Sequence, residues 1–121
     1  KKLSDNPIIR QKIAQLFIGH EVGHVLSYKI NWEQSKGGLV FAASAASESK
    51  VFGSALSQEL ANVTTEVMGL YGQVEASKWA PLNGTGPQHY QFSVAHNIFA
   101  GSSEVQRNLI AWVGLGLPRF K

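Results

Sequence analysis

Apolar residues recur at helical spacing near the start of the chain and predict a first long helix. Asn6 suits a helix N-cap, and Pro7 suits the first helical position because proline has no backbone N–H to leave unpaired. We expect this helix to run from Pro7 to about Trp32, before the break at residues 36–38. The apolar positions that follow Pro7 are Ile8, Ile9, Ile13, Leu16 and Phe17.

A second long helix is predicted from about Phe41 to Leu70. Its larger apolar residues are spaced by three or four positions, which predicts a packing face; they are Phe52, Leu56, Leu60, Val63, Val67 and Leu70. Residues 42–46 are all small, so another helix can approach the backbone closely there. Gly69 and Gly72 are placed to end this helix.

The last third of the chain predicts two short helices after an irregular loop over residues 74–88. We expect one helix from about His89 to Phe99, interrupted at Gly101. Ser102 or Ser103 can cap the next helix, and Glu104 in its first turn suits the positive end of the helix dipole. The residues expected to form its buried face are Val105, Leu109, Trp112 and Val113.

Two long and two short helices, with no strand alternation, predict an all-α fold. Short connections between helices favour antiparallel neighbours. We therefore expect an antiparallel helical bundle in which residues 1–121 form a single domain.

Composition narrows the classes of function. Hydrophobic residues make up 44% of the chain, which is enough for a folded core. The absence of cysteine fits a reducing compartment, and we expect a cytoplasmic protein that does not interact with membranes, since no apolar run approaches the roughly 20 residues of a membrane span. The net charge of +3 is not gathered into one basic patch, which argues against nucleic-acid binding.

Residues 20–24 read His-Glu-Val-Gly-His, a pattern that zinc proteases use. On a helix it places two imidazoles one turn apart, with a glutamate beside them. The third ligand of the extended pattern is missing, because Ser27 and Ile30 stand where glycine and histidine are needed. Glu48, the nearest acidic residue on the following helix, has nothing that marks it as a ligand. We therefore expect His20 and His24 to be core or interface residues and assign no metal site.

The remaining polar residues do not form a complete active site. The glutamates are scattered along the sequence; Glu66 and Glu75 flank the glycine-rich break and are the two that can meet in space, although solvated loop charges are the simpler interpretation. Ser102 and Ser103 lack the surroundings of a nucleophile elbow, so we expect them to act in helix capping.

Four segments, in this order and at this spacing, resemble the C-terminal part of acyl-CoA dehydrogenases. They are KKLSDNPIIRQK at 1–12, TTEVMGLYGQ at 64–73, FAGSSEVQRN at 99–108 and GLGLPR at 114–119. The resemblance spans nearly the whole chain. It implies a helical bundle that packs into an oligomer and closes over FAD in a flavoenzyme of fatty acid metabolism.

The resemblance also implies roles for particular residues. Gly69 and Gly72 match a turn that approaches the flavin diphosphate across a subunit boundary, and Ser102 and Glu104 match residues near its adenosine part. Glu66 stands where several members have a glutamine that faces the diphosphate, and its charge opposes that contact.

Ala100 occupies the position at which many members carry their catalytic glutamate, and alanine cannot act as a base. The chain therefore has no assigned catalytic residue. The domains that hold the flavin ring are not part of the chain.

The sequence thus predicts the C-terminal part of an FAD-dependent oxidoreductase that forms the α,β double bond of acyl-CoA. We expect the isolated chain to be inactive, to bind no cofactor alone, and to act in oligomerisation and flavin-site closure. Its partners would be further copies of the chain or the missing N-terminal and middle domains. Two alternatives remain: a free-standing helical scaffold or binding protein that forms oligomers, and a zinc hydrolase built on residues 20–24.

Overall fold

The computed structural model describes residues 2–119 and consists of helices and connecting turns. The α-helices are α1 (Pro7–Ser35), α2 (Leu39–Met68), α3 (Thr85–Ser93) and α4 (Ser103–Leu109). Shorter helical turns cover Leu3–Asp5, Gly69–Gln73, Pro81–Gly84 and Val94–Asn97, and a π-helical turn, Ile110–Gly114, extends α4. Residues 2–119 contain no strand, which confirms the predicted all-α class.

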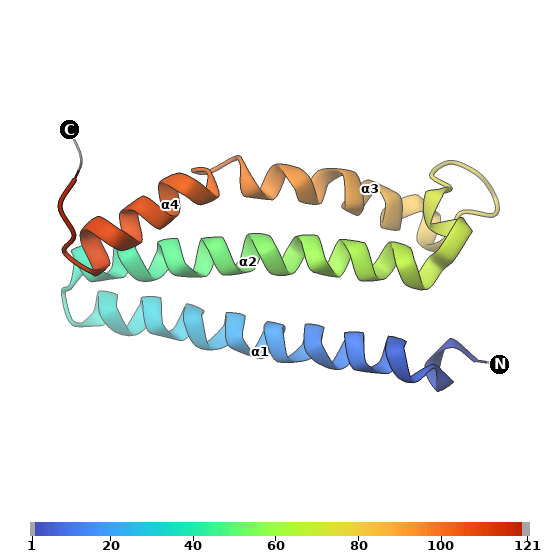
Figure 1. Ribbon diagram of the computed structural model, residues 1–121, viewed down its shortest axis with the longest axis horizontal. Helices are drawn as coiled ribbons and strands as arrows, with labels where there is room; N and C mark the ends of the chain where they lie inside the picture. Colours follow the sequence, from blue (N-terminus) through green and yellow to red (C-terminus); the bar gives the residue numbers. More distant parts are fainter. Residues whose placement is uncertain (1, 120–121) are drawn as a thin grey trace.

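Helix α2 lies in the middle of the arrangement, with α1 antiparallel to it on one side (Figure 1). On its other side α3 and α4 follow each other and run antiparallel to α2. The described ends of the chain therefore lie at opposite ends of the molecule. The long helices α1 and α2 therefore pack with a further row, which the short helices α3 and α4 form in succession.

Helix α1 begins where the sequence predicted. The side-chain oxygen of Asn6 accepts a hydrogen bond from the backbone N–H of Ile8 at 3.0 Å, and Pro7 is the first helical residue. The helix continues to Ser35, slightly beyond the expected end, and Gly37 then turns the chain with φ 73°.

The small residues at the start of α2 allow the close approach that was expected of them. Ala42, Ser44, Ala45 and Ser47 are buried. A Cβ added at Gly114, in the turn that extends α4, would collide with Ser44. The two backbones are thus held closer together than larger side chains would permit.

Helix α3 starts four residues earlier than predicted, at Thr85, inside the segment expected to be irregular. Pro87 is the third helical residue, a position where the backbone N–H has no partner within the helix and proline is tolerated. The prolines and glycines of this segment suggested a loop, whereas they fit a helix start. The irregular part is therefore shorter than predicted.

Several positions predicted to pack are exposed. Leu60 and Leu70 of the predicted α2 stripe are 44% and 84% exposed, and Val105 of α4 is 50% exposed, so the expected burial of these three residues is wrong. Each of these helices contacts neighbours on part of its surface only, because α2 separates α1 from α3 and α4. An apolar stripe predicts that a face will be covered, but not by which chain.

The hydrophobic core of the described residues is correspondingly thin. Its buried apolar members are Ala42, Ala45, Ala61 and Val63. Helix α1 has no buried residue, and large apolar side chains along it, such as Phe17 (64% exposed) and Val25 (66% exposed), face outward. None of the described helices is long and apolar enough to cross a membrane.

Replacement of Gly72 by alanine is expected to destabilise the fold. An alanine Cβ there would lie 2.8 Å from the backbone oxygen of Thr65 and 3.2 Å from the Met68 Cβ, so the turn after α2 must shift. We expect a loss of about 1–3 kcal/mol, measured by chemical denaturation followed by circular dichroism.

Gly53→Ala is the matched control for this prediction. Gly53 lies in α2 with no atom within 4 Å of an added Cβ, so its replacement should raise the free energy of unfolding by about 1 kcal/mol. The two variants are expected to change stability in opposite directions; a stabilising Gly72→Ala would show that the turn is not tightly packed.

Candidate functional site

The glycine-rich turn after α2 forms one side of an open cleft of about 640 Å³. Gly69 has φ 57° and ψ −135°, a conformation that essentially only glycine adopts, and Gly72 is buried. The cleft lies between the end of α2 and the start of α3. Its lining residues are Thr65, Glu66, Gly69, Gly72, Gln73, Glu75, Pro87, Tyr90 and Gln91.

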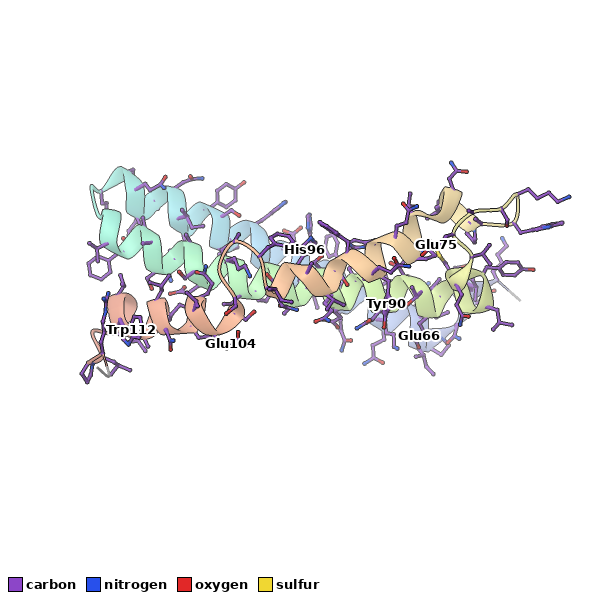
Figure 2. The ribbon with its side chains drawn as sticks, turned by 90° about the horizontal axis from the view of Figure 1, so that it is seen from above. Glu66, Glu75, Tyr90, His96, Glu104 and Trp112 are labelled. Carbon is purple, nitrogen blue, oxygen red and sulfur yellow. The ribbon has the colours of Figure 1, made fainter. Side chains whose placement is uncertain are left out.

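Glu66 and Glu75 both line this cleft, and Figure 2 shows them at the same end of the molecule as Tyr90. The Glu66 carboxylate pairs with the ammonium group of Lys12 from α1, and the Glu75 carboxylate accepts a hydrogen bond from the Gln91 amide. The two glutamates therefore line the same cleft, each with its own polar partner, and both are exposed to solvent.

The carboxylates of this cleft oppose the flavin diphosphate that the resemblance implies for it. Sites for phosphates offer positive charge or the N-terminus of a helix. Here two carboxylates line the cleft, its lining residues include no lysine or arginine, and the helix that ends at Met68 presents its negative end. These carboxylates oppose a diphosphate, although Lys12 pairs with one of them, and the role that the resemblance implies for the Gly69–Gly72 turn stays a prediction.

Ser102 and Glu104 lie at the start of α4, and Figure 2 shows Glu104 in the half of the molecule opposite Glu66. The structure thus does not bring the four residues implied in cofactor binding into one pocket. Ser102 caps α4, since its hydroxyl oxygen accepts a hydrogen bond from the backbone N–H of Val105 at 3.4 Å. The prediction that one of the two serines caps this helix is confirmed.

Glu104 is the residue of this turn whose acidity is altered. Hydrogen bonds from its own backbone amide and from the Ser102 side chain hold the pKa of the Glu104 carboxyl below its usual range, and the charges of Arg107 and Lys50 add to the effect. The carboxylate is exposed and stays ionised at neutral pH.

Ala100 precedes this turn in a left-handed conformation, with φ 55°. Its side chain is exposed and its carbonyl oxygen accepts a hydrogen bond from the Gln106 amide at 3.1 Å. The chain therefore presents a methyl group at the position that the resemblance links with a base.

A polar network centred on His96 was not anticipated from the sequence. The backbone oxygen of His96 accepts hydrogen bonds from Lys50 Nζ at 2.8 Å and from Ser54 Oγ at 3.0 Å, and Ser57 Oγ lies 2.8 Å from His96 Nδ1. The network attaches the segment between α3 and α4 to α2. A run of polar residues at helical spacing in α2 was the signal that was available for it.

Residues 20–24 lie in the middle of α1, and His20, Glu21 and His24 are all exposed. The two histidines are therefore not packed in a core of this chain, and the expectation that they lie at an interface stays a prediction. Glu48, which was considered as a further ligand, pairs instead with Lys29 at 2.6 Å.

Comparison with solved structures identifies the class of protein to which this arrangement belongs. The chain superposes on the crystal structure of the ChsE4-ChsE5 complex from Mycobacterium tuberculosis with a TM-score of 0.83 and 30% identity, over 100% of this chain and 30% of that one. It superposes on the Tcur3481-Tcur3483 steroid ACAD with a TM-score of 0.86; at 23% identity over 98% of this chain and 30% of that one, this match shows the fold alone.

The sequence comparison then defines the family. Residues 1–115 match the family model of the acyl-CoA dehydrogenase C-terminal domain, and the chain belongs to the acyl-CoA dehydrogenase family. This confirms the resemblance inferred from the sequence.

Two mycobacterial relatives support the same assignment. Acyl-CoA dehydrogenase IpdE1 of Mycolicibacterium smegmatis is 32% identical over 96% of this chain and 27% of its own length. Acyl-CoA dehydrogenase FadE26 of Mycobacterium tuberculosis is 32% identical over 98% of this chain and 30% of its own length. The chain thus spans less than a third of either relative.

Ser102→Ala should raise the pKa of Glu104, because the side-chain hydrogen bond that favours the ionised carboxylate is lost. The group has a lowered pKa in the folded state, so its contribution to stability is present above the unfolded-state pKa and is lost as the pH falls through the folded-state value. The variant should lose part of this acid-range dependence, and about 0.5–1 kcal/mol of stability with the cap.

The measurement is an NMR titration of the Glu104 side chain together with denaturation at several pH values. Ser4→Ala, which alters an exposed serine near the other end of the chain, should leave the Glu104 titration unchanged. A Glu104 pKa that is the same in Ser102→Ala and in the unmodified protein would remove the serine from the explanation.

Proposed function

We propose that this chain is the C-terminal helical part of an FAD-dependent acyl-CoA dehydrogenase-like enzyme that introduces an α,β double bond into an acyl-CoA substrate. Its own contribution is to hold subunits or domains together and to close the flavin site from one side. Membership of the family supports this proposal. The chain acts as one helical unit and needs the remaining domains for catalysis.

The exposed apolar surface of α1 is the observation that supports a role in oligomerisation. Phe17, Ile18, Val22 and Val25 are between 40% and 66% exposed, and with Glu21 and Leu26 they line a shallow depression on α1. A groove of about 600 Å³ between α1 and α2 is larger than this depression. It is lined almost wholly by apolar side chains, including Leu16, Leu56 and Val67. Large apolar surfaces of this kind mark contacts with other protein.

The residues around α4 suit the adenosine part of a flavin better than the Gly69–Gly72 turn suits its diphosphate. Adenosine is uncharged, and its hydroxyl and amino groups donate hydrogen bonds. An exposed carboxylate such as that of Glu104 can accept them. When bound, FAD supplies hydride acceptance; the residues of this chain would orient its adenosine end. Ala100 supplies no proton acceptor, so the base would come from another part of the enzyme.

The assembly is proposed to contain either further copies of this chain with the missing domains or a second, different acyl-CoA dehydrogenase chain. The ChsE4-ChsE5 structure, which is 30% identical to this chain over the matched region, is a complex of two components and supports the second arrangement.

Reconstitution tests this function. We would combine the chain with a protein that carries the N-terminal and middle domains of a relative. The measurements are the visible absorption band of bound flavin and its bleaching by acyl-CoA. Bound flavin and substrate-dependent bleaching that require both components are expected. Oligomers of the chain that form without flavin, together with no gain on mixing, would favour the free-standing scaffold.

Glu66→Gln should strengthen flavin binding in the reconstituted protein. The substitution removes a negative charge from the cleft and leaves Lys12 without its partner, so a nearby diphosphate is repelled less. Since Glu66 is exposed, we expect a decrease in the flavin dissociation constant of about two- to fivefold.

The matched control is Glu59→Gln, which removes the same charge from an exposed position of α2 outside the cleft. Flavin affinity should be unaffected by it. If Glu66→Gln also has no effect while reconstitution succeeds, the cleft does not face the diphosphate in the assembly, and the proposed enzyme remains intact.

A further inference from the structure

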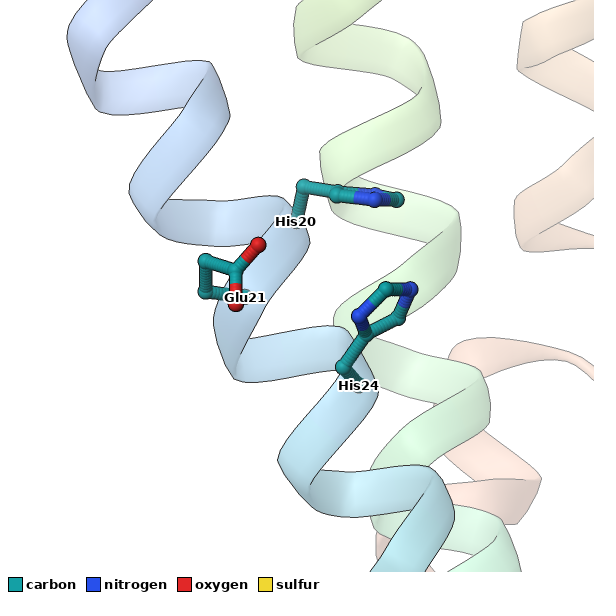
Figure 3. Close-up of side chains that lie close together, drawn as sticks. All are labelled: His20, Glu21 and His24. Carbon is teal, nitrogen blue, oxygen red and sulfur yellow. The ribbon is translucent and has the colours of Figure 1, made fainter.

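The cluster formed by His20, Glu21 and His24 has the geometry of a metal-chelating site. His20 and His24 are one helical turn apart on α1, and their ring centroids are separated by 4.4 Å with the planes tilted by 55°. One ligand atom from each of the three residues lies within 4.8 Å of those of the other two. Figure 3 shows the two imidazoles on the same side of α1, with the Glu21 side chain projecting from the helix in another direction.

These separations suit a common ion after small side-chain rotations. A zinc-like ion lies about 2.0–2.2 Å from imidazole nitrogen and carboxylate oxygen, so two ligand atoms of a tetrahedral site are about 3.3–3.6 Å apart. The three ligand atoms here, which lie within 4.8 Å of one another, must therefore move closer together around the ion. All three side chains are exposed, so they can rotate toward a shared ion without displacing packed neighbours. The helix fixes the backbone spacing, and this lowers the entropy lost on chelation.

The electrostatic surroundings also favour a bound cation. In the sequence between Lys12 and Lys29, Glu21 is the single acidic residue, and there is no lysine or arginine. Its neighbours in the depression on α1 are apolar: Phe17, Ile18, Val22, Val25 and Leu26. The exposed Glu21 carboxylate can therefore attract a positive ion that the two imidazoles also bind.

We propose that His20, Glu21 and His24 bind one divalent transition-metal ion of the zinc class. Two imidazoles and one carboxylate match the ligand preference of Zn²⁺ and its first-row neighbours, whereas Mg²⁺ and Ca²⁺ prefer sites made of oxygen ligands. The sequence pattern did not predict this site, because we expected a third ligand from a residue farther along the chain. The structure provides that ligand in Glu21 itself.

The site differs from that of a zinc protease in the role of its glutamate. In that class the glutamate activates a metal-bound water and does not bind the ion. Here Glu21 is used as a ligand, and Glu48 is paired with Lys29. The ion would therefore have three protein ligands from one helix and a remaining position open to solvent, and we assign it no hydrolytic reaction. Glu21 also lines the depression on α1 that the proposed function assigns to contact with other protein, so the ion would bind to the chain before that contact forms.

Titration of the 121-residue chain with Zn²⁺, after treatment with a chelator, tests the proposal by isothermal calorimetry. We expect one ion per chain and no binding of Mg²⁺ under the same conditions. His20→Ala and His24→Ala should each weaken Zn²⁺ binding by about tenfold or more, because each removes one of three ligands. Glu21→Gln should weaken binding less than either histidine variant, because the amide retains an oxygen ligand without the charge.

His89→Gln is the matched control, since His89 lies on α3, away from the cluster, and its loss should leave Zn²⁺ affinity unchanged. Circular dichroism establishes that each variant is folded. Binding that persists in the His20→Ala, His24→Ala double variant, or that is absent in the unmodified chain, would overturn the proposal.

Electron paramagnetic resonance of the unmodified chain loaded with Cu²⁺ is a second measurement that needs no variant. Coupling to two imidazole nitrogens is expected. Coupling to one nitrogen, or to none, would contradict chelation by the pair.

Discussion

The close contact of α2 with helices on both of its sides is the constraint on which the rest of the structure depends. Near its start, Ala42, Ser44 and Ala45 are buried, and Gly114 approaches Ser44 so closely that a methyl group would not fit between them. Farther along, α2 holds the segment between α3 and α4 through hydrogen bonds to His96. Small residues and polar contacts, more than large apolar side chains, hold these helices together.

This way of packing explains why so much apolar surface remains uncovered. A helix between two others can bury two sides, while the outer helices bury only one each. Helix α1 consequently exposes large apolar residues along its length and has no buried residue. The same openness leaves a groove between α1 and α2 and a cleft beside Gly69 and Gly72.

Charge divides the surfaces that the family relationship links with the cofactor. The cleft beside the Gly69–Gly72 turn carries Glu66 and Glu75, which oppose a diphosphate, whereas Glu104 is exposed at a turn where a neutral group with hydrogen-bond donors can be accepted. Both features are built from residues of the same chemical type. A carboxylate repels the negatively charged diphosphate, whereas it can accept hydrogen bonds from the uncharged adenosine.

The sequence by itself determined the family, the all-α class and the helix starts that depend on local chemistry. Asn6 and Pro7 specify the start of α1, and Ser102 specifies the start of α4, because a cap is formed by residues within one turn of each other. The small residues of α2 indicated a close approach correctly for the same reason, since side-chain size is a local property.

The tertiary structure decided which apolar residues are covered and which polar residues meet. Leu60, Leu70 and Val105 lie in patterns that predict burial, yet burial depends on whether a neighbour stands opposite them, and here none of the described helices covers them fully. Glu66 and Glu75 share a cleft because the chain reverses between them, and His96 reaches α2 from residues that lie far along the chain. Such contacts join distant segments, so the spacing of residues along one helix does not reveal them.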